Sequence, residues 1–85
     1  MAYSIEFKPA AFRGLAKLGK DAQKRLARRI AGLARNPRPF GVQKLKGMLD
    51  LYRLRVGDYR IIYQIQDEVL LVLIIQVGHR REVYR

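Results

Sequence analysis

The residues whose types and positions are best suited to binding or catalysis are three arginines on two consecutive predicted strands. Residues 51–56 and 59–66 alternate apolar and polar side chains, which is the pattern of half-buried strands. The two residues between these segments suit a type II′ hairpin turn, because glycine comes first. In that register Arg55 lies directly opposite Arg60, and Arg53 shares their face of the sheet.

This arrangement favours an anion-binding site over a solvated charged surface, which is the competing interpretation. Like charges that face each other across a strand pair destabilise a sheet. Guanidinium groups gathered on one face make sense where an anion binds among them, because each binds phosphate oxygens through two hydrogen bonds. The same register reasoning places Ile75 beside Arg60, so the end of the chain is expected nearby. That basic and aromatic end contains His79, Arg80, Arg81 and Tyr84.

The amino-acid composition limits the partners and the types of catalysis that the protein can use. The 85 residues include 18 Lys and Arg against 7 Asp and Glu, a formal net charge of +11. Such an excess indicates a polyanionic partner, which could be nucleic acid, an anionic membrane or an acidic protein. The chain has no cysteine and one histidine, which excludes a disulfide scaffold and cysteine catalysis and argues against a zinc site. We therefore expect no metal and no cofactor.

The remaining pattern predicts one α+β domain over residues 1–85. An N-terminal helical hairpin is expected to pack against a small, mainly antiparallel sheet in the order β-α-α-β-β-β. Asp21 is the predicted N-cap of the second helix. The predicted strands cover residues 3–8, 51–56, 59–66 and 69–77, and the helices cover 9–19 and 21–36.

Three of these segments allow finer predictions. Residues 36–49 contain prolines and glycines, which predict a connecting segment without regular structure. A two-residue turn is predicted at residues 67–68. The nearly continuous apolar run at 69–77 favours a central strand covered on both faces. The basic side of the second helix reads as a solvated surface. The start of the chain lacks the features of a signal peptide, so a soluble, cytoplasmic protein is expected.

The sheet face predicted to pack on the helices is the one opposite the arginines. Its members are Tyr52, Leu54, Ile61, Tyr63 and Ile65.

Three stretches carry a family resemblance: KLKG at 44–47, LYRLRVGDYRIIY at 51–63 and VGHRREVY at 77–84. Together with the opening strand and the helical hairpin, they resemble the RelE/ParE superfamily, the toxins of prokaryotic type II toxin–antitoxin modules. The chain is most similar to the RelE branch, whose members cleave messenger RNA in the ribosomal A site. The resemblance implies the RelE-like fold and metal-independent transesterification, in which the substrate's own 2′-hydroxyl attacks the adjacent phosphate.

The resemblance also implies roles for individual residues. Arg60 and Arg80 match phosphate-contacting arginines, Arg53 and Arg55 match basic strand positions, and Tyr84 matches a tyrosine that stacks on a base or assists proton transfer. Lys44, Lys46, His79 and Arg81 are the expected RNA-binding residues. Family members often have lysine where this chain has Arg53 and Arg55, and arginine does not lose its proton in proteins. Tyr84, with His79 as the alternative, is therefore the candidate to handle the proton.

Two other functions stay open. A ParE-like gyrase inhibitor shares the fold but does no catalysis, and a toxin-fold protein without activity would act only by binding an antitoxin. In every case the resemblance implies a RelB-like antitoxin partner, and RNA cleavage adds the ribosome and mRNA. A chain of charge +11 should attract an acidic or amphipathic partner that folds as it binds.

Overall fold

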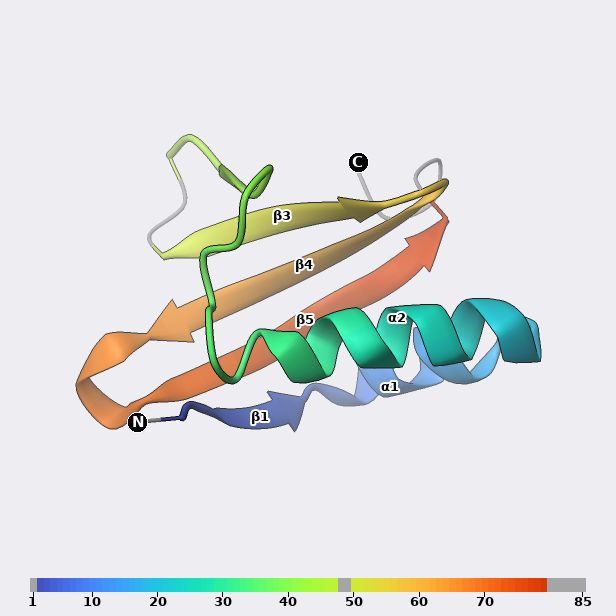
Figure 1. Ribbon diagram of the computed structural model, residues 1–85, viewed down its shortest axis with the longest axis horizontal. Helices are drawn as coiled ribbons and strands as arrows, with labels where there is room; N and C mark the ends of the chain where they lie inside the picture. The colour runs from blue at the N-terminus through green and yellow to red at the C-terminus, as the bar shows by residue number, and fades with distance from the viewer. Residues whose placement is uncertain (1, 48–49, 80–85) are drawn as a thin grey trace.

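The computed structural model describes residues 2–47 and 50–79, and it has the predicted α+β architecture (Figure 1). The elements in chain order are β1 (Ser4–Phe7), α1 (Pro9–Ala16), α2 (Lys20–Gly32), β2 (Gln43–Lys44), β3 (Leu51–Val56), β4 (Tyr59–Gln66), the 3-10 helix η1 (Asp67–Val69) and β5 (Leu71–His79). The short β2 lies in the segment predicted as a connector. Two residues are too few to show the alternation that marks a strand in a sequence.

The strands form one mixed sheet in the order β1-β5-β4-β3-β2. The β1–β5 pair is parallel and the other pairs are antiparallel, so the prediction of a mainly antiparallel sheet with a central last strand is confirmed. In Figure 1, α1 continues the line of β1 along β5, and α2 runs beside α1. None of the helices within the described residues is long and apolar enough to cross a membrane.

The core lies between α2 and the sheet face that the sequence assigns to it. All five predicted strand residues are buried, namely Tyr52, Leu54, Ile61, Tyr63 and Ile65. They share one apolar cluster with Leu26 and Ile30 from α2 and with Leu33, the C-cap of this helix. Since side chains alternate along a strand, burial of this face directs the intervening arginines to the other side of the sheet.

The helix boundaries follow local chemistry. Pro9 occupies the start of α1, where its missing N–H group leaves no hydrogen bond unmade. The prediction that Asp21 caps α2 is wrong, because Gly19 is the N-cap and the helix begins at Lys20. Asp21 instead lies in the first turn, where its carboxylate still complements the helix dipole.

The turn between β3 and β4 sets the register of the arginines as predicted. Val56 pairs with Tyr59 and Arg55 pairs with Arg60. Gly57 has a φ of 60°, and Asp58 is not among the residues with positive φ, as a type II′ turn requires.

The register between β4 and β5 differs from the prediction, because Arg60 pairs with Gly78 and not with Ile75. Two features cause the difference. The connection over residues 67–70 is longer than a two-residue turn, and Leu70 closes it with a φ of 53°. A β-bulge between Ile62 and Tyr63 then shifts the register further.

Candidate functional site

Two rows of residues cross the sheet on the side away from the core. The first row joins Gln43 on β2, Arg53 on β3, Ile62 on β4 and Gln76 on β5. The second row joins Arg55, Arg60 and Gly78 on β3, β4 and β5. We call the surface formed by these seven residues the arginine face. Its neighbouring strands are about 4.8 Å apart, which is close enough for the guanidinium groups to act on one ligand.

The β2 edge of the arginine face is hollowed. A pocket of about 220 Å³ is lined by Gly41, Gln43, Arg53 and Arg55. Arg53 is half-buried there and its Nη2 donates a hydrogen bond to the side-chain oxygen of Gln43, whereas Arg55 is exposed. Gln43 thus orients one guanidinium, a role that the sequence does not reveal because β2 leaves no periodic pattern.

A set of polar contacts holds the connector that carries β2. Arg38 donates hydrogen bonds to both carboxylate oxygens of Asp67, at 2.8 and 3.2 Å, and its Nε donates to the Tyr52 hydroxyl at 3.2 Å. The Tyr3 hydroxyl donates to Asp67 at 2.5 Å. We call Arg38, Asp67, Tyr52 and Tyr3 the connector clamp. It ties the connector to β3 and to the turn before β5.

The electrostatics of the clamp follow from these contacts. The hydrogen bonds from Arg38 and then from Tyr3 lower the pKa of Asp67 from 3.8 to about 2. Asp67 in turn raises the pKa of Arg38 and that of Tyr3. Burial raises the pKa of Tyr63, whose hydroxyl donates to the carbonyl oxygen of Pro37 at 2.7 Å. At neutral pH Asp67 therefore stays negatively charged and Arg38 positively charged, and the hydroxyl groups of Tyr3 and Tyr63 keep their protons.

The structure brings together some of the predicted site residues and separates others. Arg53, Arg55 and Arg60 share one face, as predicted. Lys44 pairs with the buried Tyr52, so strand alternation directs it to the side of the sheet that carries the helices.

The other predicted residues lie at or beyond the ends of the described segments. Lys46 is exposed in the turn after β2. His79 ends β5 and pairs with Tyr59, with ring centroids 5.9 Å apart, and alternation places it opposite to Gly78 and so away from the arginine face. Arg80, Arg81 and Tyr84 lie outside the described residues, so their roles remain predictions.

A metal site finds no support in the geometry of residues 2–47 and 50–79. No three His, Cys, Asp or Glu side chains gather there closely enough to hold a metal ion.

Comparison with known proteins identifies the family. A profile described as the ParE toxin of the type II toxin–antitoxin system, parDE, matches residues 5–84. The mRNA interferase toxin RelE of Escherichia coli K12 is 38% identical over 88 residues, which cover 99% of this chain and 92% of that protein. The toxin RelG of Mycobacterium tuberculosis is 33% identical over 86 residues, covering 100% of this chain and 99% of that protein.

Solved structures agree with the sequence matches. The intact E. coli RelBE toxin–antitoxin complex contains a chain that superposes with a TM-score of 0.81 at 32% identity, covering 92% of this chain and 96% of that one. The archaeal RelE–RelB complex from Pyrococcus horikoshii gives a TM-score of 0.83 at 31% identity, covering 98% and 100%. The protein belongs to the RelE/ParE superfamily of type II toxin–antitoxin toxins, and its fold is the RelE fold.

Proposed function

We propose that this protein is the toxin of a type II toxin–antitoxin module and an endoribonuclease that cleaves mRNA in the A site of the ribosome. The relatives named mRNA interferases support the reaction class. The observation that carries the proposal is the direct pairing of Arg55 with Arg60, with Arg53 in the neighbouring row. Such a concentration of positive charge weakens a sheet and strengthens a phosphate site.

The proposed chemistry is transesterification within the RNA. The 2′-hydroxyl oxygen attacks the adjacent phosphorus, the bond to the 5′-oxygen breaks, and the products carry a 2′,3′-cyclic phosphate and a 5′-hydroxyl. Negative charge grows on the phosphate oxygens in the transition state, and fixed cations aimed at those oxygens lower the barrier. Arg55 and Arg60, with Arg53 oriented by Gln43, supply that charge without a metal.

The proton must be taken from the 2′-hydroxyl and given to the leaving oxygen. Arginine keeps its proton in proteins, so Arg53 and Arg55 stabilise charge and do not act as bases. The orientation of His79 away from the arginine face favours Tyr84 as the group that handles the proton, with Arg80 as a further phosphate contact.

The named relatives and the arginine face favour this function over ParE-like inhibition of gyrase, although the matching profile carries the ParE name. The solved RelB–RelE complexes support a RelB-like antitoxin as the partner. A partner with acidic residues fits a toxin of charge +11. Action on ribosomes in the cytoplasm follows from the proposed substrate.

Primer extension on a defined mRNA, with purified protein and programmed ribosomes, tests the proposal. We expect cuts inside A-site codons only when ribosomes are present, and none when the attacking nucleotide carries a 2′-deoxy sugar. Arg60→Ala should lower the cleavage rate by about 100- to 1,000-fold. The matched control is Arg28→Ala, which removes an exposed arginine from α2 and should leave the rate unchanged.

Two results would contradict the proposal. Intact mRNA in all conditions would reject RNA cleavage, and gyrase inhibition would then be measured. Products with a 5′-phosphate in place of the 5′-hydroxyl would reject attack by the 2′-hydroxyl.

A further inference from the structure

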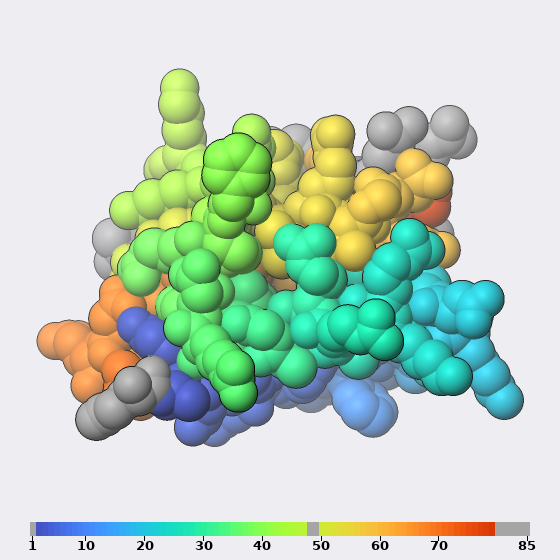
Figure 2. Space-filling view, viewed as in Figure 1, coloured from blue at the N-terminus to red at the C-terminus, as the bar shows by residue number. Residues whose placement is uncertain are grey.

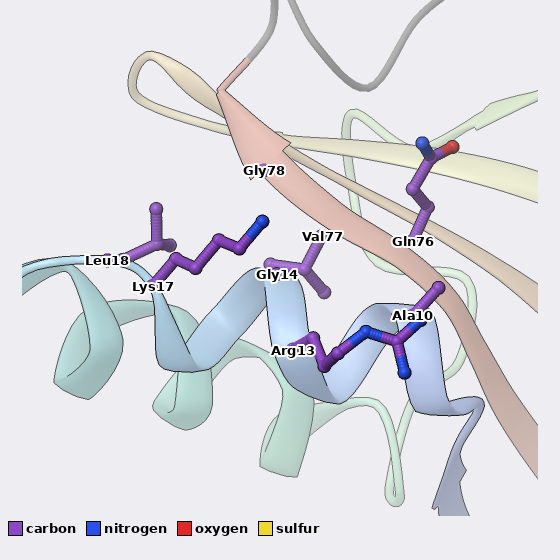
Figure 3. A pocket seen from close by; sticks show the side chains of 8 residues that line it. All are labelled: Ala10, Arg13, Gly14, Lys17, Leu18, Gln76, Val77 and Gly78. Atoms are coloured by element: carbon purple, nitrogen blue, oxygen red, sulfur yellow. The ribbon is translucent and has the colours of Figure 1, made fainter.

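A second hollow lies where α1 meets the end of β5. It has a volume of about 300 Å³ and is lined by Ala10, Arg13, Gly14, Lys17, Leu18, Gln76, Val77 and Gly78. In Figure 3, Arg13 and Lys17 extend from α1 beside the strand, and Gln76 projects from the strand. We call this hollow the α1–β5 pocket.

The backbone geometry explains why the pocket forms at this place. Gly14 approaches β5 so closely that a Cβ atom on it would lie 2.2 Å from the carbonyl oxygen of Val77. The contact seats α1 against the edge of β5 that β1, which pairs only with residues 71–74, leaves uncovered. It also places Arg13 and Lys17, which flank Gly14 at the end of α1, beside the end of the strand.

The α1–β5 pocket is continuous with the arginine face. Gln76 ends the first row of that face and Gly78 ends the second row, and both line the pocket. The hollow lined by Arg53 and Arg55 lies at the opposite edge of the same rows. Since β3 and β5 are two strand spacings apart, about 10 Å separates these two parts of the face.

The cations of the pocket have no acidic partner within the described part of the chain. Arg13 and Lys17 are exposed and lie one helical turn apart. Among the described residues the single ion pair joins Arg38 to Asp67, and Asp67 precedes the other end of β5. The pocket therefore presents two positive side chains that are open to a negatively charged ligand.

We propose that Arg13 and Lys17 bind a backbone phosphate of the RNA whose reacting phosphate lies on the arginine face. This subsite rests on the proposed function and adds a phosphate contact outside the reaction centre. One phosphate group cannot reach across about 10 Å from β3 to β5, whereas a chain of phosphates can. A strand of RNA therefore fits the continuous basic surface better than a free phosphate does.

The residues that line the α1–β5 pocket also favour RNA over a protein as its ligand. Protein interfaces are anchored by large apolar or aromatic side chains in buried pockets. The exposed large hydrophobic residues of the described chain are Phe12, Phe40 and Val69, and none of them lines the α1–β5 pocket.

A pair of charge-matched double variants tests the subsite. Arg13→Ala with Lys17→Ala removes the pocket cations, and Lys24→Ala with Arg28→Ala removes two exposed cations of the same spacing from α2. In Figure 2 the side of the molecule with α2 faces the viewer, and its side chains project into the solvent. Both variants lose the same charge, but only the first alters the pocket.

The experiment measures the affinity of each variant for RNA and ribosomes under conditions in which the RNA cannot be cleaved. The probes are a short single-stranded RNA that carries a 2′-deoxy sugar at the attacking position, ribosomes programmed with that RNA, and ribosomes without it. The pocket variant should bind about tenfold more weakly than the control variant. The dependence of its log affinity on log salt concentration should also be shallower by about 0.7 for each phosphate that the variant no longer binds.

The probes separate the possible outcomes. A selective loss on the free RNA and on programmed ribosomes, with binding to empty ribosomes unchanged, supports contact with the mRNA. A selective loss on empty ribosomes with binding to the free RNA unchanged would overturn the proposal, because the phosphate would then belong to ribosomal RNA. Equal losses in the two double variants would overturn the subsite, because net charge alone would explain them. A selective loss of affinity for the antitoxin, with RNA binding intact, would overturn it as well. Cleavage by the unaltered protein on ribosomes programmed with the corresponding RNA that keeps this 2′-hydroxyl tests the proposed function separately.

Discussion

Arg55 is the residue at which function and folding stability oppose each other most directly. Its side chain is exposed and faces Arg60 across the hairpin, so the two positive charges repel each other. Cross-strand pairs contribute roughly 0.2–1 kcal/mol to sheet stability, and like charges carry the unfavourable sign. A sheet optimised for stability alone would place a neutral or acidic residue at this position.

Arg55→Ala should therefore separate the two properties. We expect the free energy of unfolding to stay the same or to rise by up to about 1 kcal/mol, because the repulsion is removed. The rate of mRNA cleavage should fall by about 100-fold, because a cation that stabilises the transition state is removed. Urea unfolding and primer extension measure the two effects, with Arg28→Ala as the exposed control. A loss of stability that parallels the loss of cleavage would show that Arg55 has a structural role instead.

Among the elements, the connector before β3 depends on polar contacts for its position. The connector clamp joins it through Arg38 to Asp67, and this ion pair is half-exposed. Because folding lowers the pKa of Asp67 from 3.8 to about 2, the clamp stabilises the folded state fully above the higher value. That stabilisation is lost as the pH falls through the lower value, when the carboxyl group takes up a proton in the folded protein.

Asp67→Asn should remove this part of the pH dependence. The difference in unfolding free energy between the unaltered protein and the variant should be largest above about pH 5 and should shrink toward about pH 2. Because the pair is exposed to solvent, the difference should also decrease as salt is added. Urea unfolding at a series of pH values measures it. A difference that stays constant over this range would mean that the amide disturbs the turn and that the charge of Asp67 is not the cause.

The seam between α1 and β5 is the element contact most sensitive to volume. Gly14→Ala should destabilise the fold by about 1–3 kcal/mol, because the new methyl group meets a backbone carbonyl that cannot turn away. This cost exceeds the gain of up to about 1 kcal/mol that alanine brings within a helix. Gly32→Ala is the matched control, since nothing lies within 4 Å of its Cβ position, and it should stabilise α2. Equal shifts in the urea midpoints of the two variants would contradict the close approach.

Over the whole molecule, the sequence predicts what depends on nearby residues and misses what depends on packing. The arginine rows on β3 and β4 are predictable, because the two-residue turn at Gly57 fixes their register locally. The β4–β5 register is not predictable from the sequence. The positive φ of Leu70 leaves no mark in the residue pattern, nor does the register shift at Ile62 and Tyr63, which skips Ile75 in the continuous apolar run of β5. Gln43 and the α1–β5 pocket likewise depend on contacts between distant segments.

The net charge of the whole chain leads to a final prediction: added salt should stabilise the folded toxin but weaken its binding to RNA. Eleven excess positive charges repel one another, and one ion pair has both of its members within residues 2–47 and 50–79. Raising the KCl concentration from about 0.05 to about 0.5 M shortens the screening length from more than about 10 Å to well below it. The melting temperature of the free toxin should therefore rise, while its affinity for RNA should fall.

A charge-reduced variant provides the internal control for this effect. Lys24→Gln with Arg28→Gln lowers the net charge on the solvent-exposed side of α2 without touching the arginine face or the α1–β5 pocket. Its melting temperature at low salt should be higher than that of the unaltered protein, and the rise on adding KCl should be smaller, because less repulsion remains to be screened. Thermal unfolding followed by circular dichroism measures both values. A melting temperature that falls with salt would mean that attractive charge contacts dominate the folded state, in contradiction to the single ion pair of the described chain.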